Sequence, residues 1–452
     1  MQIAVIDALF NDHYMKLNKI FFAVGLLFAA GACAQQPLTI EQAIATSLAN
    51  NYDILLSRND STLAALDYEY ANYAFYPRIN ANAGYNLTSN NSKQVLADGT
   101  KRERDDIRSN NLVASVNLNW TLFDGFKMFA TKKKLEKLIG LGELQIKNQV
   151  IITVSDVMRS YYDLARQQQQ LKAIEETMQL SEERLRFAQY KFDIGTGAKP
   201  DVLQAQIDLN AQRSAHLTQQ TLILKTKEIL NQLLSIPVAT DFTVQDTIPV
   251  NTLLILDSVQ NGLTTVNPQL LLIQQSLEVA GLTLAERRAE RYPTVQFNSA
   301  YNFNRTDNKS VINPFQPLFN QNRGLNYGLT ATIPILNGFT TRRLIRAAEL
   351  DIEYQELQYK RGLSLITSSI SNAYKDYDLS KRTLLLEEEN IKLVRENLFI
   401  ARERYRLGIS TFLEMREAQR SLEDANNRLI QSRYNTKVAE IELMRLRGDL
   451  VR

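Results

Sequence analysis

Residues 112–126 read LVASVNLNWTLFDGF, and up to residue 122 they alternate between apolar and polar side chains, with Val113 as the one exception. Alternation with a period of two over about ten residues predicts a β-strand with one apolar and one polar face. That length is also what a tilted strand needs to cross a bilayer. Three further stretches alternate in the same way, with apolar positions at Ile79, Ala81, Ala83, Tyr85 and Leu87, at Val295, Phe297, Tyr301 and Phe303, and at Leu325, Tyr327, Leu329, Ala331 and Ile333.

The chain carries this pattern twice. The segment Leu122–Phe126 matches Ile335–Phe339 at an offset of 213 residues, and the same offset places 191–195 on 404–408. Two tandem copies of one unit are therefore expected. We predict a first structural repeat at 38–236, a linker or small equatorial segment at 237–265, and a second repeat at 266–447.

The four predicted strands suit a membrane better than a soluble core, although an ordinary antiparallel sheet remains the alternative. Their polar faces consist mainly of Asn, Thr, Ser and Gly, as expected for a water-filled lumen, and Tyr and Trp lie near the strand ends. The segments that join the strands, 89–110 and 305–324, are long and polar and are expected as loops. Because four strands cannot close a barrel and open edges cannot face lipid, the membrane interpretation requires oligomers.

The rest of the chain predicts unusually long helices. No proline interrupts 127–194, and an apolar residue recurs every seven positions from Val157 to Phe192. The second copy repeats this phase from Ile370 to Tyr405, which indicates coiled-coil packing. We expect each long helix to end at a glycine, Gly195 or Gly408, before helices over 201–234 and 411–447 return along it. Shorter helical segments over 40–75 and 268–291 lead into the strands.

Composition excludes several functional classes. The 452 residues carry 52 Lys and Arg against 49 Asp and Glu, so the net charge of +3 gives no reason to expect nucleic acid. Two histidines and one cysteine leave almost nothing for His or Cys metal sites or for nucleophilic catalysis. We expect no enzyme, no cofactor and no metal site; a hydrolase that uses carboxylates alone is the weakest alternative.

The first 34 residues predict a secretory signal peptide with an upstream start-site extension. Residues 15–37 contain two lysines, a short apolar run and small residues before a polar stretch. Ala32-Cys33-Ala34 offers a cleavage site before Gln35. Cys33 leaves a second possibility open, in which cleavage precedes the cysteine and a lipid is attached to it.

The signal peptide, the duplicated unit of helix, two strands and long helix, and the order of the segments resemble the TolC family of outer-membrane efflux proteins. The resemblance covers essentially the whole mature chain. It implies a mainly α fold with membrane β-structure: a homotrimer whose four strands per chain form a twelve-stranded barrel in outer-membrane lipid, above a coiled-coil periplasmic tunnel. It also implies a periplasmic adaptor protein and an inner-membrane pump as partners.

The resemblance also implies functional residues at the far tip of the tunnel. Glu414 and Glu417 match acidic residues that ring the pore constriction, although a solvated helix surface explains most such pairs. Tyr405, with Asp201 as its partner, matches a latch residue of the closed tip, while Ser410 departs from the charged residue at the best-known latch position. The turns at Gly195 and Gly408 would contact the adaptor.

Three functions are compatible with these features. The favoured one is a passive conduit that carries small molecules or ions through the outer membrane, with energy supplied by the pump. A conduit for protein secretion would have the same fold. A periplasmic coiled-coil adaptor or scaffold would share the signal peptide and heptads, but it would need a compact β domain around one hairpin.

Overall fold

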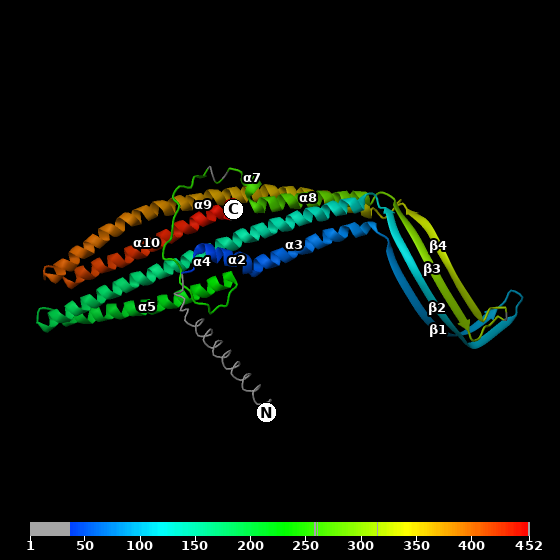
Figure 1. The fold of residues 1–452 in the computed structure, drawn as a ribbon, viewed down its shortest axis with the longest axis horizontal. Coiled ribbons are helices and arrows are strands. Elements are labelled where there is room, and N and C mark those ends of the chain that lie inside the picture. Colours follow the sequence, from blue (N-terminus) through cyan, green and yellow to red (C-terminus); the bar gives the residue numbers. More distant parts are fainter. Residues whose placement is uncertain (1–36, 257–258, 260, 314, 451–452) are drawn as a thin grey trace, which may run out of the picture. The chain divides into compact units, whose positions relative to one another are not determined.

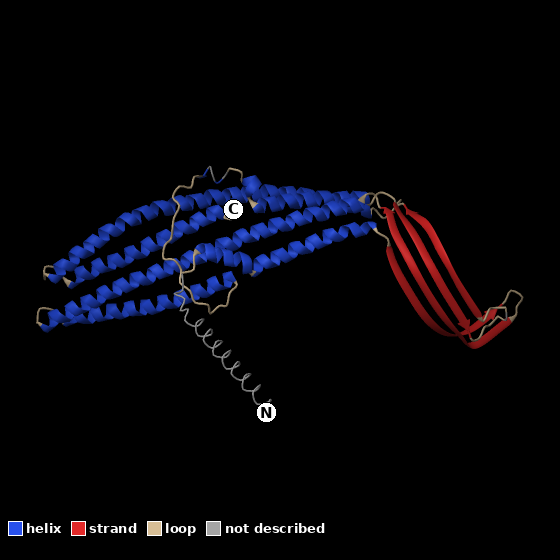
Figure 2. Cartoon of the chain, in the orientation of Figure 1, coloured by secondary structure: helices blue, strands red, loops and turns tan. Residues whose placement is uncertain are grey.

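A computed structural model describes residues 37–256, 259, 261–313 and 315–450. The predicted signal peptide and Cys33 lie outside the described residues. Figures 1 and 2 show that helices make up most of the chain and that all four strands belong to one sheet. In chain order the elements are α2 (Ile40–Asn50), α3 (Tyr52–Ala71), η1 (Asn72–Phe75), β1 (Arg78–Val95), β2 (Lys101–Phe123), α4 (Lys127–Asp193), α5 (Lys199–Leu234), α7 (Leu263–Val266), α8 (Pro268–Ala289), β3 (Thr294–Asn308), β4 (Phe319–Thr332), α9 (Thr340–Arg406) and α10 (Phe412–Arg447).

The chain divides into two compact units, and each contains parts of both sequence copies. The sheet unit comprises the described residues of 52–152, 254–374 and 443–452, and the hairpin unit comprises those of 37–51, 153–253 and 375–442. The sheet unit holds β1–β4 and the helices next to them. The hairpin unit holds both glycine turns.

The four strands form an antiparallel meander in the order β1-β2-β3-β4. Their register places apolar residues beside apolar residues: Ala81 pairs with Val116, Val116 with Tyr301, and Tyr301 with Leu325. Polar residues pair in the same way one position on, as Asn80 does with Asn117. The sheet therefore has one apolar and one polar face, as the alternation predicted.

All four strands extend into the segments that the sequence predicted as loops. In the segment 305–324, β3 continues to Asn308 and β4 begins at Phe319. The segment 89–110, expected as a loop, is mostly strand, because β1 continues to Val95 and β2 begins at Lys101. An ion pair between Lys93 and Glu103 at 2.8 Å stabilises this extension across the two strands. The ladder shifts register beside Asp106, whose φ of 54° indicates a bulge.

Local signals explain where several helices begin. Thr39 and Gln42 form a reciprocal capping box at the start of α2. Asn267 caps α8 by accepting a hydrogen bond from the Leu270 amide at 2.9 Å, and Pro268 follows at the first helical position.

Within the part of the chain that the structure describes, no helix is both long and apolar enough to cross a membrane.

Helices of the sheet unit lie close together where small residues permit it. A Cβ added at Gly142 of α4 would lie 2.9 Å from Ser61 of α3, and one at Gly362 of α9 would lie 2.7 Å from Ile273 of α8. Leu284 of α8 packs with Ile345 and Ala348 of α9 in a buried cluster. Within this unit α3 therefore packs against α4, and α8 packs against α9.

In the hairpin unit the predicted heptads form the core unequally. In the second copy, the five heptad positions that belong to this unit are all buried: Tyr377, Leu384, Ile391, Leu398 and Tyr405. The sixth position, Ile370, belongs to the sheet unit and is buried as well. In the first copy Val157 and Leu164 are fully buried, whereas Leu171, Met178 and Leu185 are only partly covered. The second copy therefore makes the tighter helical pair in a single chain.

Candidate functional site

Each long helix ends at the glycine that the sequence indicated. Gly195 and Gly408 both have a φ of +79°, in the left-handed region that favours glycine. Two turn amides satisfy the last carbonyl groups: Thr196 donates to Lys191 and Ile409 donates to Arg404, each at 2.9 Å. A Cβ at either glycine would meet no atom within 4 Å, so only the backbone conformation requires glycine.

Tyr405 lies buried beside the second turn. It packs edge-on against Phe412, with ring centroids 6.4 Å apart. The Lys191 ammonium lies 3.8 Å from the Tyr405 ring centroid and donates a hydrogen bond to the Tyr405 carbonyl at 2.9 Å. Lys191 therefore joins the end of α4 to the end of α9, a contact that sequence reasoning missed.

Asp201 acts on both of these residues through its charge. Burial raises the pKa of the Tyr405 hydroxyl, and the negative charge of Asp201 raises it further. Burial lowers the pKa of Lys191, and Asp201 opposes that shift. Among the described residues no hydrogen bond joins Tyr405 to Asp201. The two predicted latch residues are therefore close enough for the Asp201 charge to affect Tyr405, but they form no direct bond.

The two predicted constriction residues lie in the first turns of α10, three positions apart. Thr411 caps this helix through its hydroxyl, which accepts a hydrogen bond from the Glu414 amide at 3.2 Å. The Glu414 carboxylate forms an ion pair with Arg404 at 2.7 Å and is partly covered. Glu417 is exposed and has no ion pair within the described chain. The sequence did not indicate that one of the two acids is paired inside its own chain.

A partly buried charge cluster lies farther from the turns, and sequence reasoning missed it entirely. Arg184 of α4 is 3% exposed and donates to Asp208 of α5 at 2.6 Å. Arg416 of α10 reaches the same carboxylate at 3.0 Å and 3.3 Å. The Arg184 guanidinium also lies 5.3 Å from the Phe412 ring centroid. This clamp, formed by Arg184, Asp208 and Arg416, connects three helices.

Two opposing effects act on the buried Arg184 guanidinium of the clamp. Burial lowers the pKa of Arg184, and the Asp208 charge opposes that effect. The sequence did contain a weak signal, since the offset of 213 places uncharged Asn397 and Ser421 opposite Arg184 and Asp208. The two copies therefore differ at the positions where the first copy, through Arg184 and Asp208, contacts α10.

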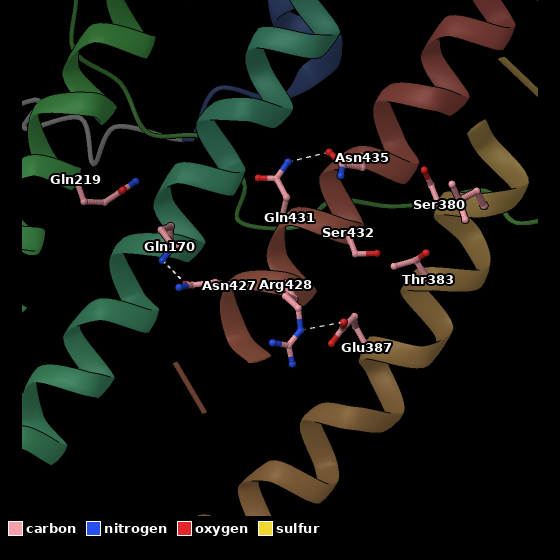
Figure 3. Close-up of a pocket in the computed structure, with 11 residues that line it drawn as sticks. Gln170, Gln219, Ser380, Thr383, Glu387, Asn427, Arg428, Gln431, Ser432 and Asn435 are labelled. Carbon is pink, nitrogen blue, oxygen red and sulfur yellow. Dashed lines mark hydrogen bonds and ion pairs between the residues drawn. The ribbon is translucent and has the colours of Figure 1, made fainter. Parts of the chain in front are cut away.

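A polar groove of about 710 Å³ lies between the helices of the hairpin unit (Figure 3). Gln170 donates to Asn427 across it at 2.6 Å, and Arg428 is neutralised by Glu387 at 3.0 Å. The other lining residues are mainly amides and hydroxyls: Gln219, Ser380, Thr383, Gln431, Ser432 and Asn435. Such walls suit water, and they present no unpaired charge to a ligand.

An antiparallel sheet with one apolar face, continued by coiled helices that end in glycine turns, defines the class of outer-membrane channels that prolong a barrel into the periplasm. The comparisons with known proteins agree. The sequence profile of the family "Outer membrane efflux protein" matches residues 43–235 and 263–449. The chain belongs to this family.

Individual relatives are distant in sequence but similar over most of their length. The chain is 20% identical over 414 residues to the probable efflux pump outer membrane protein TtgC of Pseudomonas putida, covering 90% of this chain and 82% of that protein. Its fold is similar to that of the outer-membrane channel OprN, with a TM-score of 0.75, 17% identity and coverage of 91% and 90%. The outer membrane protein VceC of Vibrio cholerae has a TM-score of 0.73 at 15% identity, with coverage of 90% and 96%.

Family and fold together settle the broad function. The protein is an outer-membrane efflux channel whose helical part lies in the periplasm. This result confirms the favoured sequence interpretation. It does not fit the two alternatives, the protein-secretion conduit and the periplasmic adaptor.

Proposed function

We propose that three copies of the chain assemble into one conduit. The edges of the sheet support this assembly, because among the described residues β1 pairs only with β2 and β4 only with β3. Unpaired backbone groups along 18 residues of β1 and 14 residues of β4 could not face hydrocarbon. Pairing β4 of one copy with β1 of the next satisfies both edges, and three copies give twelve strands. The unpaired edges carry the proposal of a closed ring, and the number of three copies follows from the twelve-stranded barrel that the resemblance to the family implies.

The conduit is passive and works with two partners. A periplasmic adaptor contacts the turns at Gly195 and Gly408, and an inner-membrane pump supplies the energy. The cargo is small molecules or ions, and no cofactor or catalytic group takes part. The exposed apolar residues around both turns support an interface there: Ile194, Leu203, Leu407, Ile409 and Leu413.

The entrance to the conduit is a constriction behind these turns. Glu414 and Glu417 of three chains place up to six carboxylates near one axis, which attract cations and repel anions. The ion pair with Arg404 reduces the charge of Glu414, so Glu417 contributes the larger share. Tyr405 and Asp201 help to hold the closed arrangement, and the clamp fixes α10 behind them.

Gel electrophoresis tests the assembly. Outer membranes are solubilised and run with and without boiling. We expect a band near three times the monomer mass that collapses to the monomer on heating. A protein that is monomeric in the membrane fraction would contradict the proposal.

Single-channel recordings test the constriction. The double variant Glu414→Gln/Glu417→Gln keeps the side-chain shape and removes the charge, so cation preference and block by Ca²⁺ or Mg²⁺ are expected to weaken. Glu396→Gln, at an exposed acid of α9, is the matched control and leaves both unchanged. Arg404→Gln frees Glu414 and strengthens cation preference. Unchanged selectivity in the double variant would show that both acids belong to a solvated helix surface and do not line the constriction.

A further inference from the structure

Positive charge gathers where the strands meet the helices of the sheet unit. We define this collar as residues 66–78, 124–137, 281–293 and 333–346, which join α3, α4, α8 and α9 to β1–β4 (Figure 1). The collar contains twelve Lys and Arg against six Asp and Glu, a net charge of +6. The whole chain has a net charge of only +3. Basic residues are therefore concentrated in the part of the sheet unit where the strands join the helices.

Half of these cations have no acidic partner in the part of the chain that the structure describes. Lys134 binds Glu286 at 2.5 Å, and Lys127 binds Glu290 at 2.8 Å. Six other basic residues have no ion pair among the described residues: Arg78, Lys132, Lys133, Arg291, Arg342 and Arg343. Unpaired cations in such number are available to an anionic partner.

The collar also carries aromatic side chains. Tyr73, Tyr76, Phe126, Phe129 and Tyr292 are each more than half exposed. Exposed rings beside membrane strands are typical of the level of the lipid headgroups. Cationic and aromatic residues thus occupy the same band.

A groove of about 440 Å³ lies between α4 and α8 within this band. Phe126, Phe129 and Tyr292 form its aromatic walls. Gly281 also lines it, and a Cβ added there would meet no atom within 4 Å, so a larger side chain at this position would enter open space. Two basic residues, Lys133 and Arg288, line it as well, and within the described part of the chain the only ion pair of Arg288 is with Glu349 at 3.6 Å.

The groove adjoins the apolar face of the sheet. Phe126 and Phe129 also line a second cavity, together with Trp120 and Leu122 from the end of β2. The Trp120 indole donates to the Phe75 carbonyl at 2.7 Å, and the Phe75 ring lies 5.2 Å from that of Phe129. An acyl chain that lies along the apolar face of β2 can therefore continue into the groove.

We propose that this groove binds an anionic phospholipid of the periplasmic leaflet. The acyl chain lies between the aromatic walls, and Lys133 and Arg288 bind the phosphate. A free phosphate would not need the apolar walls, and a zwitterionic lipid would gain less from the surplus charge. The proposal depends on the position of the strands in the membrane and not on the cargo of the channel.

Native mass spectrometry of the purified trimer tests the proposal. Delipidated protein is titrated with phosphatidylglycerol, with phosphatidylethanolamine and with inorganic phosphate as a competitor. We expect phosphatidylglycerol to bind more tightly than phosphatidylethanolamine, and millimolar phosphate not to displace it. Equal binding of the two lipids, or displacement by phosphate at these concentrations, would overturn the proposal.

Two variants locate the site. Lys133→Gln/Arg288→Gln removes two headgroup contacts and should weaken phosphatidylglycerol binding about 30-fold, at roughly five-fold per basic residue. Lys392→Gln/Arg395→Gln makes the same charge change at exposed positions of α9 in the hairpin unit and should not weaken it. Equal losses in both variants would show that binding follows net charge alone.

Gly281→Leu keeps every charge and fills the groove, so it separates shape from electrostatics. Because nothing in the chain opposes a side chain at this helical position, the variant is expected to fold and to form the heat-sensitive trimer. It should also lose tight phosphatidylglycerol binding. Wild-type binding by an assembled Gly281→Leu trimer would rule out the groove as the site.

Discussion

The clamp makes the strongest prediction about the periplasmic tip. Asp208 accepts hydrogen bonds from both Arg184 and Arg416, and it is itself 18% exposed. Asp208→Asn would leave the Arg184 cation buried without a counterion. Removing one partner of a buried ion pair typically costs about 3 to 5 kcal/mol. Arg416 is 38% exposed and can turn to water, so we expect the lower limit, about 3 kcal/mol.

Hydrogen exchange can measure this cost directly, because it reports local opening. A loss of about 3 kcal/mol should speed amide exchange near 204–212 and 412–420 roughly 100-fold, while amides of β2 keep their protection. Glu182→Gln is the matched control. Its pair with Arg213 spans 3.9 Å between half-exposed side chains and should be worth well under about 1 kcal/mol.

A compensating variant separates charge from packing. Arg184→Met/Asp208→Leu replaces the buried pair by apolar side chains and should recover most of the protection, since such exchanges are often neutral or stabilising. Equal exchange rates in Asp208→Asn and Glu182→Gln would refute the reasoning, because the clamp would then contribute no more than a surface pair.

Three further perturbations test other parts of the protein. Val116→Arg places a charge on the apolar face of β2 and should cost about 2 to 4 kcal/mol of barrel stability, whereas Asn117→Arg on the polar face should be milder; equal trimer yields would argue against a lipid face. Gly408→Val forces a β-branched residue to a φ of +79°, so docking of the adaptor and efflux should fall while the trimer still forms; wild-type resistance to drugs and metals would contradict the tip assignment. Burial raises the pKa of Tyr162 to about 12, so the folded state keeps its proton between pH 10 and 12 where the unfolded chain loses it. Stability should therefore fall by about 1.4 kcal/mol per pH unit over that window, and Tyr162→Phe should lose less on going from pH 9 to 11 in thermal unfolding.

Periodicity predicted the architecture because each face of an element meets one environment along its length. Alternation identified the central parts of all four strands, since the two faces of these strands meet lipid and water. The outer parts of β1 and β2 carry polar residues on both faces, so hydropathy gave no signal there. Only cross-strand pairing, such as that of Lys93 with Glu103, shows that the segment is strand.

Residue roles were harder to predict than elements. A glycine at the end of a long heptad run is a local signal, and both turns have the expected backbone conformation. The Arg184, Asp208 and Arg416 side chains lie on three helices and resemble solvated charges in the sequence. Only packing shows that Arg184 is buried. The ion pair of Glu414 with Arg404 likewise depends on how α9 turns into α10.

Oxidative cross-linking of engineered cysteines tests the central claim, that β4 of one chain pairs with β1 of the next in a closed trimer. On a Cys33→Ala background, which removes the only cysteine, Ala83→Cys in β1 is combined in turn with Leu325→Cys, Tyr327→Cys or Leu329→Cys in β4. A pair at Val116 and Tyr301, which face each other within one chain, serves as the control. At least one edge combination should give dimer and trimer bands on oxidation and nothing larger, while the control stays monomeric on the gel. No intermolecular product, or a ladder beyond three chains, would contradict the closed trimer.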